Sequence, residues 1–548
     1  MEAAHRTVTD SITGVPMTVS TSAFLLGRAE VTQAEFERTM GKNPSRFRGA
    51  DRPVENVTWR EATEYCNRRS AAEGLGRCYD DTGHWDRACT GYRLPTDAEW
   101  TSAAGTPSKG QLAAADLYSG ETSVKAISAR AAEGTHPVEK AGASAASSGF
   151  EDLFGNVWEL CFDRFSNRPI IDSVWNPSGP QTGDARVIRG GSFLTQESQW
   201  NKGFRASQPP VRRSPYTGFR IARSLPSSDV PGSYEIVGVE PVHSTDPPAQ
   251  PDTEILRNRW MRVLGSPPLP KREMEAVLVQ TYIEPAWTAR LIELKLEDEV
   301  PWRSLLVMPA HASGERLPVV IVPYYDVDTP AGKNMGGRIA TPSSVRAFAH
   351  VAAQFGMAAL AVTWSGENDG PGYLEVVADL AERYPGVTGL GYWIWQSQQV
   401  VNWLSAQPEI DPARIGIMGR SLGGKMALYA SAFEPRIHAV VSSEPGIALE
   451  FSNYGDPWYF GERLGLLPPG ADQHELLELI APRPFLLIAG ESADGEKSLA
   501  LMRNAAPAYA ALGKPDALCI LNHRTGHTPT PAAVVSAMAF LHKQLTAR

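Results

Sequence analysis

The string GRSLG at residues 419–423 places a serine in the spacing that is typical of a catalytic nucleophile. The apolar run RIGIM precedes this string, and the helix-compatible GKMALYASAF follows it. A strand, a tight turn and a helix in this order make a nucleophile elbow, in which the glycines permit close approach and the serine hydroxyl stays exposed. We therefore predict Ser421 as the nucleophile of an acyl transfer, against the alternative of a serine that caps the helix.

The general base is expected in the loop after the last strand. The run ALCILN is followed by His523 and His527, and we predict His527, which stands in a Gly-His step before prolines, as the base. The acid that orients this base stays open between two residues. Asp494 follows the run PFLLIAG, in the usual order of serine, acid and histidine, and Glu444 follows the run HAVVSS.

Acyl transfer also needs two donors for the oxyanion. The backbone N–H of Leu422, directly after the nucleophile, is the first predicted donor. The loop after LPVVIV carries a Pro-Tyr pair that resembles the cocaine-esterase and prolyl-oligopeptidase type, in which the tyrosine hydroxyl is the donor. This resemblance implies Tyr324 as the second donor, with a packing aromatic as the alternative.

The elements that position these residues follow from the pattern of apolar runs. After residue 252, the β-branched runs alternate with helical stretches, which predicts a mostly parallel sheet with helices on both faces, the α/β-hydrolase fold, over residues 252–548. Residues 225–251 are rich in Ser, Pro and Asp and are predicted to be a linker. Residues 1–224 have short apolar stretches between turns and one clear helical pattern at 59–74. The predicted strand runs are RSLLVMPA, LPVVIVPYY, MAALAVTW, RIGIMG, HAVVSS, PFLLIAG and ALCILN.

The segment SLGGKMALYASAFEPRIHAVVSSEPG resembles the glucuronoyl esterases, with Lys four and Glu 23 residues after the serine. In fungal members that Glu is the triad acid, which implies Glu444. A wider group of dienelactone-hydrolase-like esterases, matched through HELLELIAPRP, uses the later Asp, which implies Asp494. Lys425 would meet a substrate carboxylate or hydroxyl, with a solvated lysine as the alternative. The sequence departs from the glucuronoyl esterases at Leu422, where they carry an oxyanion-stabilising Arg.

Aromatic residues are frequent in the regions that should cap the sheet. Core packing explains most of them, and we predict Trp395 as one that lines an acyl or sugar pocket.

Six strings in the first domain resemble the formylglycine-generating enzyme (sulfatase-modifying factor) family: VTQAEFERTMGKNPSRF, PVENVTWREATEYCN, GYRLPTDAEW, DLFGNVWEL, RVIRGGSF and TGFRIARS. The resemblance implies an irregular α+β, C-type-lectin-like fold. The family's activity depends on two copper-binding cysteines, and Thr195 and Trp200 stand where these would align. Formylglycine formation is therefore not expected. The 11 His also lack the HxxxHxE pattern of the related iron enzymes.

Members of that family hold calcium at the segment DLFGNVWE. By position, the resemblance implies a structural Ca²⁺ held by the Asp152 side chain, the carbonyls of Gly155 and Val157, and Glu159. A plain turn with solvated carboxylates is the alternative.

The cysteines and the overall charge bound the remaining functions. Four of the five cysteines lie in the first domain and are predicted as buried thiols, with a Cys78–Cys89 pair as the alternative. A net charge of −9 without a basic block argues against nucleic acid. No signal peptide or run of 18 apolar residues is present, which favours a soluble, cytoplasmic protein without a membrane partner. The four cysteines of the first domain are Cys66, Cys78, Cys89 and Cys161.

The sequence thus predicts a serine carboxylic-ester hydrolase with a non-oxidising N-terminal accessory domain and no catalytic cofactor. Its substrate would be a small-molecule or carbohydrate ester, and the oligomeric state is not indicated. One alternative passes the acyl group to another acceptor, as in a thioesterase, cyclase or transacylase. A second makes the N-terminal domain the working part, as a redox metalloenzyme or a substrate-binding module.

Overall fold

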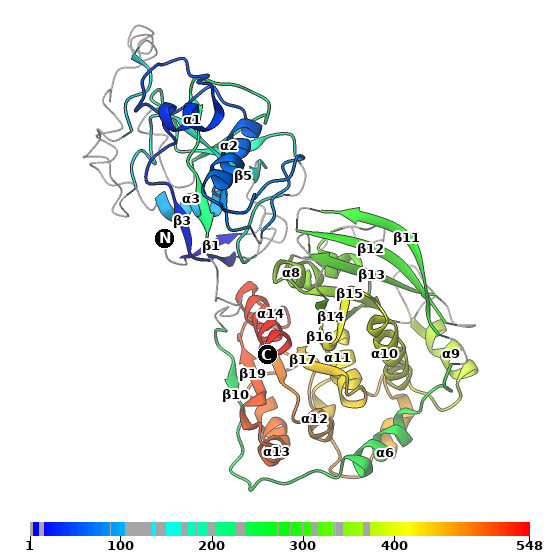
Figure 1. The fold of residues 1–548 in the computed structure, drawn as a ribbon. Helices are drawn as coiled ribbons and strands as arrows, with labels where there is room; N and C mark the ends of the chain where they lie inside the picture. Colours follow the sequence, from blue (N-terminus) through cyan, green and yellow to red (C-terminus); the bar gives the residue numbers. More distant parts are fainter. Residues whose placement is uncertain are drawn as a thin grey trace. The chain divides into compact units, whose positions relative to one another are not determined.

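The computed structural model divides the chain into two compact units (Figure 1). One is built mainly of residues 18–231 and the other of residues 232–548. Each has its own hydrophobic core, as separate domains do. The structure describes residues 4–9, 16–87, 89–104, 133–138, 150–166, 174–180, 183–195, 204–225, 236–270, 273–284, 286–296, 301–309, 316–333, 335, 344–364 and 373–547.

The described part of the N-terminal unit combines small sheets with short helices, which fits the predicted irregular α+β domain. Its C-type-lectin relationship stays a prediction. Two sheets have the strand orders β3-β9-β4 and β7-β6-β5-β8, and β1 pairs with β2. The strands before residue 225 are β1 (Ala4–Thr9), β2 (Pro16–Thr21), β3 (Phe24–Leu26), β4 (Tyr92–Arg93), β5 (Trp158–Arg164), β6 (Arg186–Arg189), β7 (Arg205–Gln208), β8 (Thr217–Gly218) and β9 (Ala222–Ser224), and the helices are α1 (Gln33–Met40), α2 (Trp59–Ala72) and α3 (Asp97–Ala104).

Helix α2 corresponds to the helical pattern predicted at residues 59–74. A capping box starts it, because the Thr58 side chain accepts the Glu61 N–H while the Glu61 carboxylate accepts the Thr58 N–H. The inner face of the helix buries Tyr65 and Cys66 completely in the core of the unit.

The cysteines of this unit differ from the prediction in one pair. Cys78 and Cys89 form a disulfide, with their Cα atoms 5.1 Å apart. The prediction of buried thiols was wrong for these two, since spacing in sequence does not reveal Cα separation. Cys66 and Cys161 are buried free thiols, as predicted.

The C-terminal unit is built on a ten-stranded sheet in the order β10-β19-β18-β17-β16-β14-β15-β13-β12-β11. From β19 to β15 neighbouring strands run parallel, and the strands at both edges run antiparallel. The predicted α/β-hydrolase sheet is thereby confirmed. The strands are β10 (Glu240–Pro241), β11 (Glu275–Ile283), β12 (Trp287–Lys295), β13 (Trp302–Pro309), β14 (Leu317–Tyr324), β15 (Ala358–Thr363), β16 (Ile410–Arg420), β17 (Ile437–Ser443), β18 (Phe485–Ala489) and β19 (Leu518–Asn522).

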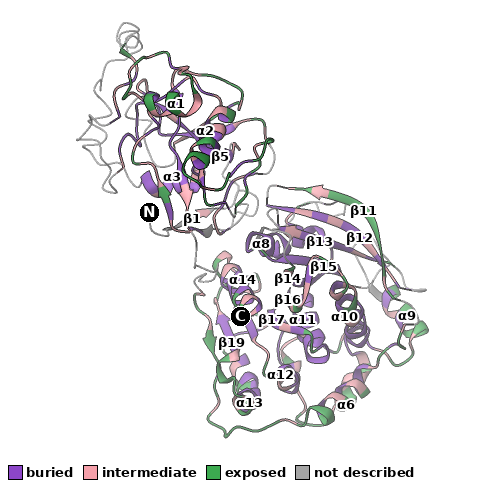
Figure 2. Ribbon diagram, in the orientation of Figure 1, coloured by how far each residue is buried: buried purple, intermediate pink, exposed green. Residues whose placement is uncertain are grey.

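Helices cover this sheet on both faces (Figure 1). Helices α8 and α14 pack together against one side, and α10, α11 and α12 pack together on the other. The central strands are buried over most of their length, apart from the first half of β16, which explains why they read as continuous apolar runs (Figure 2). The helices are α6 (Thr253–Leu264), α7 (Asp328–Ala331), α8 (Phe348–Gln354), α9 (Tyr373–Arg383), α10 (Gly389–Ser405), α11 (Leu422–Phe433), α12 (His474–Ile480), α13 (Ser498–Ala511) and α14 (Pro531–Thr546).

The edges of the sheet were not predicted. Strand β10 lies inside the predicted linker 225–251 but pairs with β19, so part of that segment belongs to the C-terminal unit. Two residues are too few to give a periodic pattern. At the other edge, β11 is exposed along almost its whole length (Figure 2), including the apolar Val277, Leu278 and Val279.

No helix among the described residues is both long enough and apolar enough to cross a membrane.

Candidate active site

Ser421 occupies the turn between β16 and α11. Its φ of 56° and ψ of −116° lie in a region that non-glycine residues rarely adopt. Its side chain makes no capping hydrogen bond to α11, so the structure does not have the helix-cap arrangement. Such a conformation costs on the order of 1–3 kcal/mol and persists at functional sites because the surrounding structure imposes it.

Two glycines allow this turn to form. A Cβ on Gly419 would collide with the Gly423 carbonyl, and a Cβ on Gly423 would collide with the carbonyl oxygen of Pro323. The elbow is therefore packed backbone against backbone, which fixes the serine relative to the end of β14.

His527, in the loop after β19, contacts Glu444, which follows β17, and strand β18 lies between these two strands in the sheet. The His527 Nδ1 atom lies 3.4 Å from Oε2 of Glu444. Glu444 directly follows β17 and is 1% exposed, whereas the side chain of His527 is 38% exposed. The Glu444 carboxylate also accepts the N–H groups of Gly490, Ala493 (2.7 Å) and Asp494 (3.2 Å). A buried carboxylate held in this way can orient an imidazole ring.

Asp494 has a different set of partners. Its carboxylate accepts the N–H of Gly446 at 2.6 Å, the N–H of Ile447 at 2.7 Å and the Ser498 hydroxyl at 2.9 Å. Burial raises the pKa of Asp494 to about 6, and these hydrogen bonds oppose the rise. Among the described contacts, none joins Asp494 to His527. The structure thus brings Glu444 to the histidine, while Asp494 holds the turn that follows Glu444.

His523, the other predicted histidine, lies in the same loop. Its Nδ1 contacts the Thr525 hydroxyl at 2.7 Å, and burial lowers its pKa while Glu444 opposes this effect.

The structure places the two predicted oxyanion donors, Leu422 and Tyr324, in different surroundings. Leu422 begins α11, so its N–H is one of the unpaired donors of the first helical turn. The hydroxyl of Tyr324 is buried and accepts a hydrogen bond from Arg346 at 2.9 Å. The side chain of the next residue, Tyr325, lies near Ser421. Burial and the Tyr324 hydroxyl raise the pKa of Tyr325, and the interaction with Ser421 opposes this rise. Side chains of successive residues point in alternate directions at the end of β14, so Tyr324 and Tyr325 have different surroundings.

Lys425 is buried rather than solvated. Its Nζ donates to the Ser452 hydroxyl at 2.7 Å and to Oδ1 of Asn453 at 3.2 Å. The same atom lies 4.7 Å from the ring centre of Tyr454 and 4.9 Å from that of Tyr459. Burial lowers the pKa of Lys425 to about 8, against the raising effect of nearby carboxylates. Lys425 therefore fixes the segment after β17, beside the candidate site.

We expect the titration of Lys425 to make the free energy of unfolding depend on pH. A folded pKa below the unfolded value of 10.5 means that the folded state gives up its proton first, so the free energy of unfolding should rise between about pH 8 and pH 10. Relative to Lys425→Met, wild type should gain about 1–3 kcal/mol over this interval, measured by urea unfolding at several pH values. Parallel curves for the two proteins would contradict the shifted pKa.

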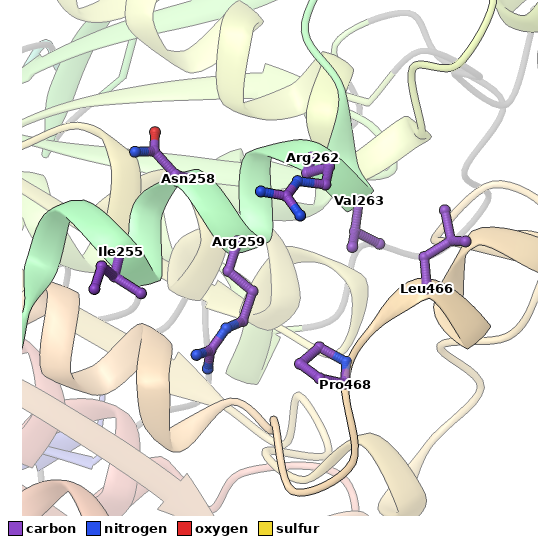
Figure 3. A pocket seen from close by; sticks show the side chains of 7 residues that line it. All are labelled: Ile255, Asn258, Arg259, Arg262, Val263, Leu466 and Pro468. Carbon is purple, nitrogen blue, oxygen red and sulfur yellow. The ribbon is translucent and has the colours of Figure 1, made fainter.

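Among the described contacts, neither Trp395 nor the pocket beside α6 touches Ser421, His527 or Glu444. Trp395 packs against Trp302 and Tyr392, and its indole N–H donates to the Pro268 carbonyl at 3.0 Å, so its donor is not free for a substrate. A pocket-lining role of Trp395 stays a prediction. A separate pocket on the outer side of α6 contains none of the predicted site residues (Figure 3). It is lined by Ile255, Asn258, Arg259, Arg262, Val263, Leu466 and Pro468.

The two predicted acidic calcium ligands of the N-terminal unit differ in their partners. Glu159 is fully buried and both its oxygens pair with Arg220 at 2.6 Å, while Trp100 donates to one of them at 2.8 Å. These bonds use much of the hydrogen-bonding capacity of the Glu159 carboxylate, and its role as a calcium ligand stays a prediction. Asp152 does keep a buried oxygen without a hydrogen-bond partner, and burial raises its pKa to about 6. Gly155 and Val157 lie between these two acids in the chain.

Among the described residues, no group of three or more His, Cys, Asp or Glu side chains is arranged to hold a metal ion. At the positions aligned with the copper cysteines, the Thr195 hydroxyl accepts the Ser192 N–H at 2.9 Å, and Trp200 lies outside the described residues. Burial raises the pKa of the Cys66 and Cys161 thiols, which disfavours the thiolate that copper requires.

Comparison with known proteins separates the two units. Residues 4–225 match the family model of the sulfatase-modifying factor enzyme 1-like domain. Residues 383–449 match the model of the fungal glucuronyl esterases, and this stretch contains Ser421, Lys425 and Glu444.

Individual relatives follow the same division. The chaperone protein LppX of Paenibacillus barcinonensis is 30% identical over 244 residues, which cover 38% of this chain and 82% of that protein. The 4-O-methyl-glucuronoyl methylesterase 1 of Wolfiporia cocos (strain MD-104) is 31% identical over 155 residues, covering 23% of this chain and 38% of its own length. A solved glucuronoyl esterase from Solibacter usitatus has a TM-score of 0.45 at 17% identity and covers 55% of this chain and 98% of its own.

The glucuronyl esterase match contains the serine elbow and the buried Glu444, the two parts of the site that lie closest to each other in sequence. Through residues 4–225 the chain belongs to the family of sulfatase-modifying factor enzyme 1-like domains, and its C-terminal unit is similar to glucuronoyl esterases.

Proposed function

We propose that the C-terminal unit hydrolyses its ester through an acyl-enzyme formed on Ser421. The observation that supports this most strongly is the contact of His527 with the buried Glu444, together with a strained turn at Ser421, whose N–H donates to the carbonyl of Ser443 directly before Glu444. A nucleophile, a base and an acid in this relation form the arrangement that activates a hydroxyl for attack.

In the first half of the reaction, Ser421 Oγ attacks the ester carbonyl and His527 Nε2 takes the hydroxyl proton. Glu444 accepts the hydrogen bond of His527 Nδ1–H and stabilises the imidazolium that forms. The negative oxygen of the tetrahedral intermediate receives the Leu422 N–H and the Tyr325 hydroxyl. The imidazolium then protonates the departing alcohol. A water molecule, which His527 deprotonates, then attacks the acyl-enzyme carbonyl. The ester bond to Ser421 breaks, the serine oxygen takes the proton from His527, and the acid is released.

The substrate class we favour is the ester of a sugar acid. The support is the matched stretch around Ser421 and the relative named 4-O-methyl-glucuronoyl methylesterase. The hydrogen bonds of Lys425 to Ser452 and Asn453 indicate that this lysine acts by shaping the wall of the site, and a sugar hydroxyl would reach it only by replacing one of these partners.

The test uses the full chain with two reagents. A fluorophosphonate probe should label one serine per chain, and hydrolysis of p-nitrophenyl acetate and methyl glucuronate should follow saturation kinetics, with the higher kcat/KM for the glucuronate. If neither labelling nor hydrolysis occurs, the proposed chemistry is wrong. If only the small acetate is hydrolysed, the chemistry stands and the sugar-acid substrate falls.

Replacing the hydroxyl of Tyr325 tests the second oxyanion donor. Tyr325→Phe should lower kcat by about 10²–10³-fold, because one donor to the developing charge is lost, while KM changes little. Tyr324→Phe is the matched control, and its loss should be much smaller because Arg346 already occupies that hydroxyl. Steady-state kinetics on the two variants decide the matter, and the opposite ranking would return the role to Tyr324.

A further inference from the structure

Arg420, which directly precedes the nucleophile, is a buried cation with unusual partners. It is 8% exposed and ends strand β16. Its Nε donates to the backbone carbonyl of His527 at 3.1 Å, and its Nη2 donates to the Thr528 hydroxyl at 3.3 Å. Both acceptors belong to the loop that carries the candidate base, more than 100 residues further along the chain.

No salt bridge among the described residues includes Arg420. An arginine that is buried without a carboxylate pays a large desolvation cost, so its hydrogen bonds must carry its role. By contrast, Arg414 on the same strand pairs in the ordinary way with Asp411 at 2.6 Å. The position of Arg420 is thus not explained by general charge pairing.

The loop that Arg420 holds needs outside support. It runs from β19 to α14 without regular structure, and Arg524 and Gly526 have positive φ. Its described backbone anchors include the Gly526 N–H, which donates to the Gly490 carbonyl at 2.7 Å. The 3.4 Å contact between His527 and Glu444 is long for a hydrogen bond and would not fix the ring by itself.

We propose that Arg420 is a positioning residue that sets the distance between the nucleophile and the general base. Arg420 is adjacent to Ser421 in the chain, and its planar guanidinium holds two donors in fixed directions. These donors connect the elbow to the His527 carbonyl and the Thr528 hydroxyl. The inference rests on the proposed function, because it requires Ser421 and His527 to act together. It differs from direct oxyanion stabilisation, since the described acceptors of the guanidinium belong to the base loop.

The test compares Arg420→Gln, Arg420→Lys and Arg414→Gln in the full chain. Arg420→Gln should lower kcat by about 10–100-fold, because a small misplacement of the base is costly, and should leave KM within about twofold. Arg420→Lys, which keeps the charge but loses the paired donors, should fall between wild type and Arg420→Gln. Guanidinium, added far below denaturing concentration, should restore part of the kcat of Arg420→Gln. Arg414→Gln should match wild type.

The outcomes distinguish a failure of the role proposed for Arg420 from a failure of the proposed function. A kcat for Arg420→Gln within about twofold of wild type overturns the inference. So does a loss of kcat that follows the loss of thermal stability and is not rescued by guanidinium, since this marks a role in folding alone. If Arg420→Gln does not fold, a wild-type kcat in Arg420→Lys overturns it. A wild type without serine labelling or ester hydrolysis instead refutes the proposed function, and the inference with it.

Discussion

Ser421→Ala is expected to reduce kcat for ester hydrolysis by about 10⁴–10⁶-fold and to abolish fluorophosphonate labelling. The variant lacks the oxygen that forms the acyl-enzyme, and neither His527 nor Glu444 can replace it. The residual rate should come from the oxyanion donors and from substrate binding alone. Because substrate still binds, isothermal titration with a non-hydrolysable ester analogue should give nearly the wild-type affinity.

The matched control is Ser431→Ala on helix α11. The Ser431 hydroxyl donates to the Ala427 carbonyl at 2.7 Å within its own helix, so this substitution removes a buried hydroxyl that has no place in the site. Its kcat should equal that of wild type. A Ser421→Ala protein that retains more than about a tenth of wild-type kcat would mean that another residue attacks the ester.

Glu444→Gln should produce the second-largest effect, a fall in kcat of about 10³–10⁴-fold. The amide cannot stabilise the imidazolium as a carboxylate does. Its NH₂ group would also face N–H donors of Gly490, Ala493 or Asp494. The measurement is kcat against pH, since a neutral side chain at 444 should also reduce the fraction of correctly oriented base.

Asp494→Asn is the matched comparison that decides which of the two acids orients His527. One of the N–H donors of Gly446 and Ile447 would lose its acceptor, which should lower the free energy of unfolding by about 1–3 kcal/mol. Its kcat should fall by less than about tenfold, because Asp494 supports the turn and does not contact the histidine. If Asp494→Asn loses more kcat than Glu444→Gln, the two acids have to exchange roles.

The sequence was most informative about the elbow and the central sheet. The seven apolar runs predicted as strands are β13 to β19, and the turn at Ser421 joins β16 to α11 as the GRSLG string requires. These features are local, because each depends on a few consecutive residues. Strands β10, β11 and β12 were not predicted, since β10 is two residues long, β11 is exposed on most of its length, and β12 mixes buried and half-buried residues instead of forming an apolar run.

The choice of acid and of tyrosine depends on relations that the sequence does not contain. Strands β17 and β18 are neighbours in the sheet, so the residues that follow them lie close together and Glu444 and Asp494 each bind the other's loop. Only the register of the strands shows which carboxylate faces His527. In the same way, Tyr324 and Tyr325 are adjacent in sequence but point to different partners, Arg346 and Ser421.

The backbone contacts of the elbow have a consequence for redesigning the enzyme. Gly419 packs on Gly423, and Gly423 packs on Pro323, so the serine is fixed by atoms that no side-chain replacement alters. Libraries that vary the aromatic segment around Tyr454 and Tyr459 should therefore change substrate preference without displacing the nucleophile. The elbow glycines themselves should tolerate no larger residue. Positions that can be varied to change the substrate are therefore different from the positions that hold the nucleophile.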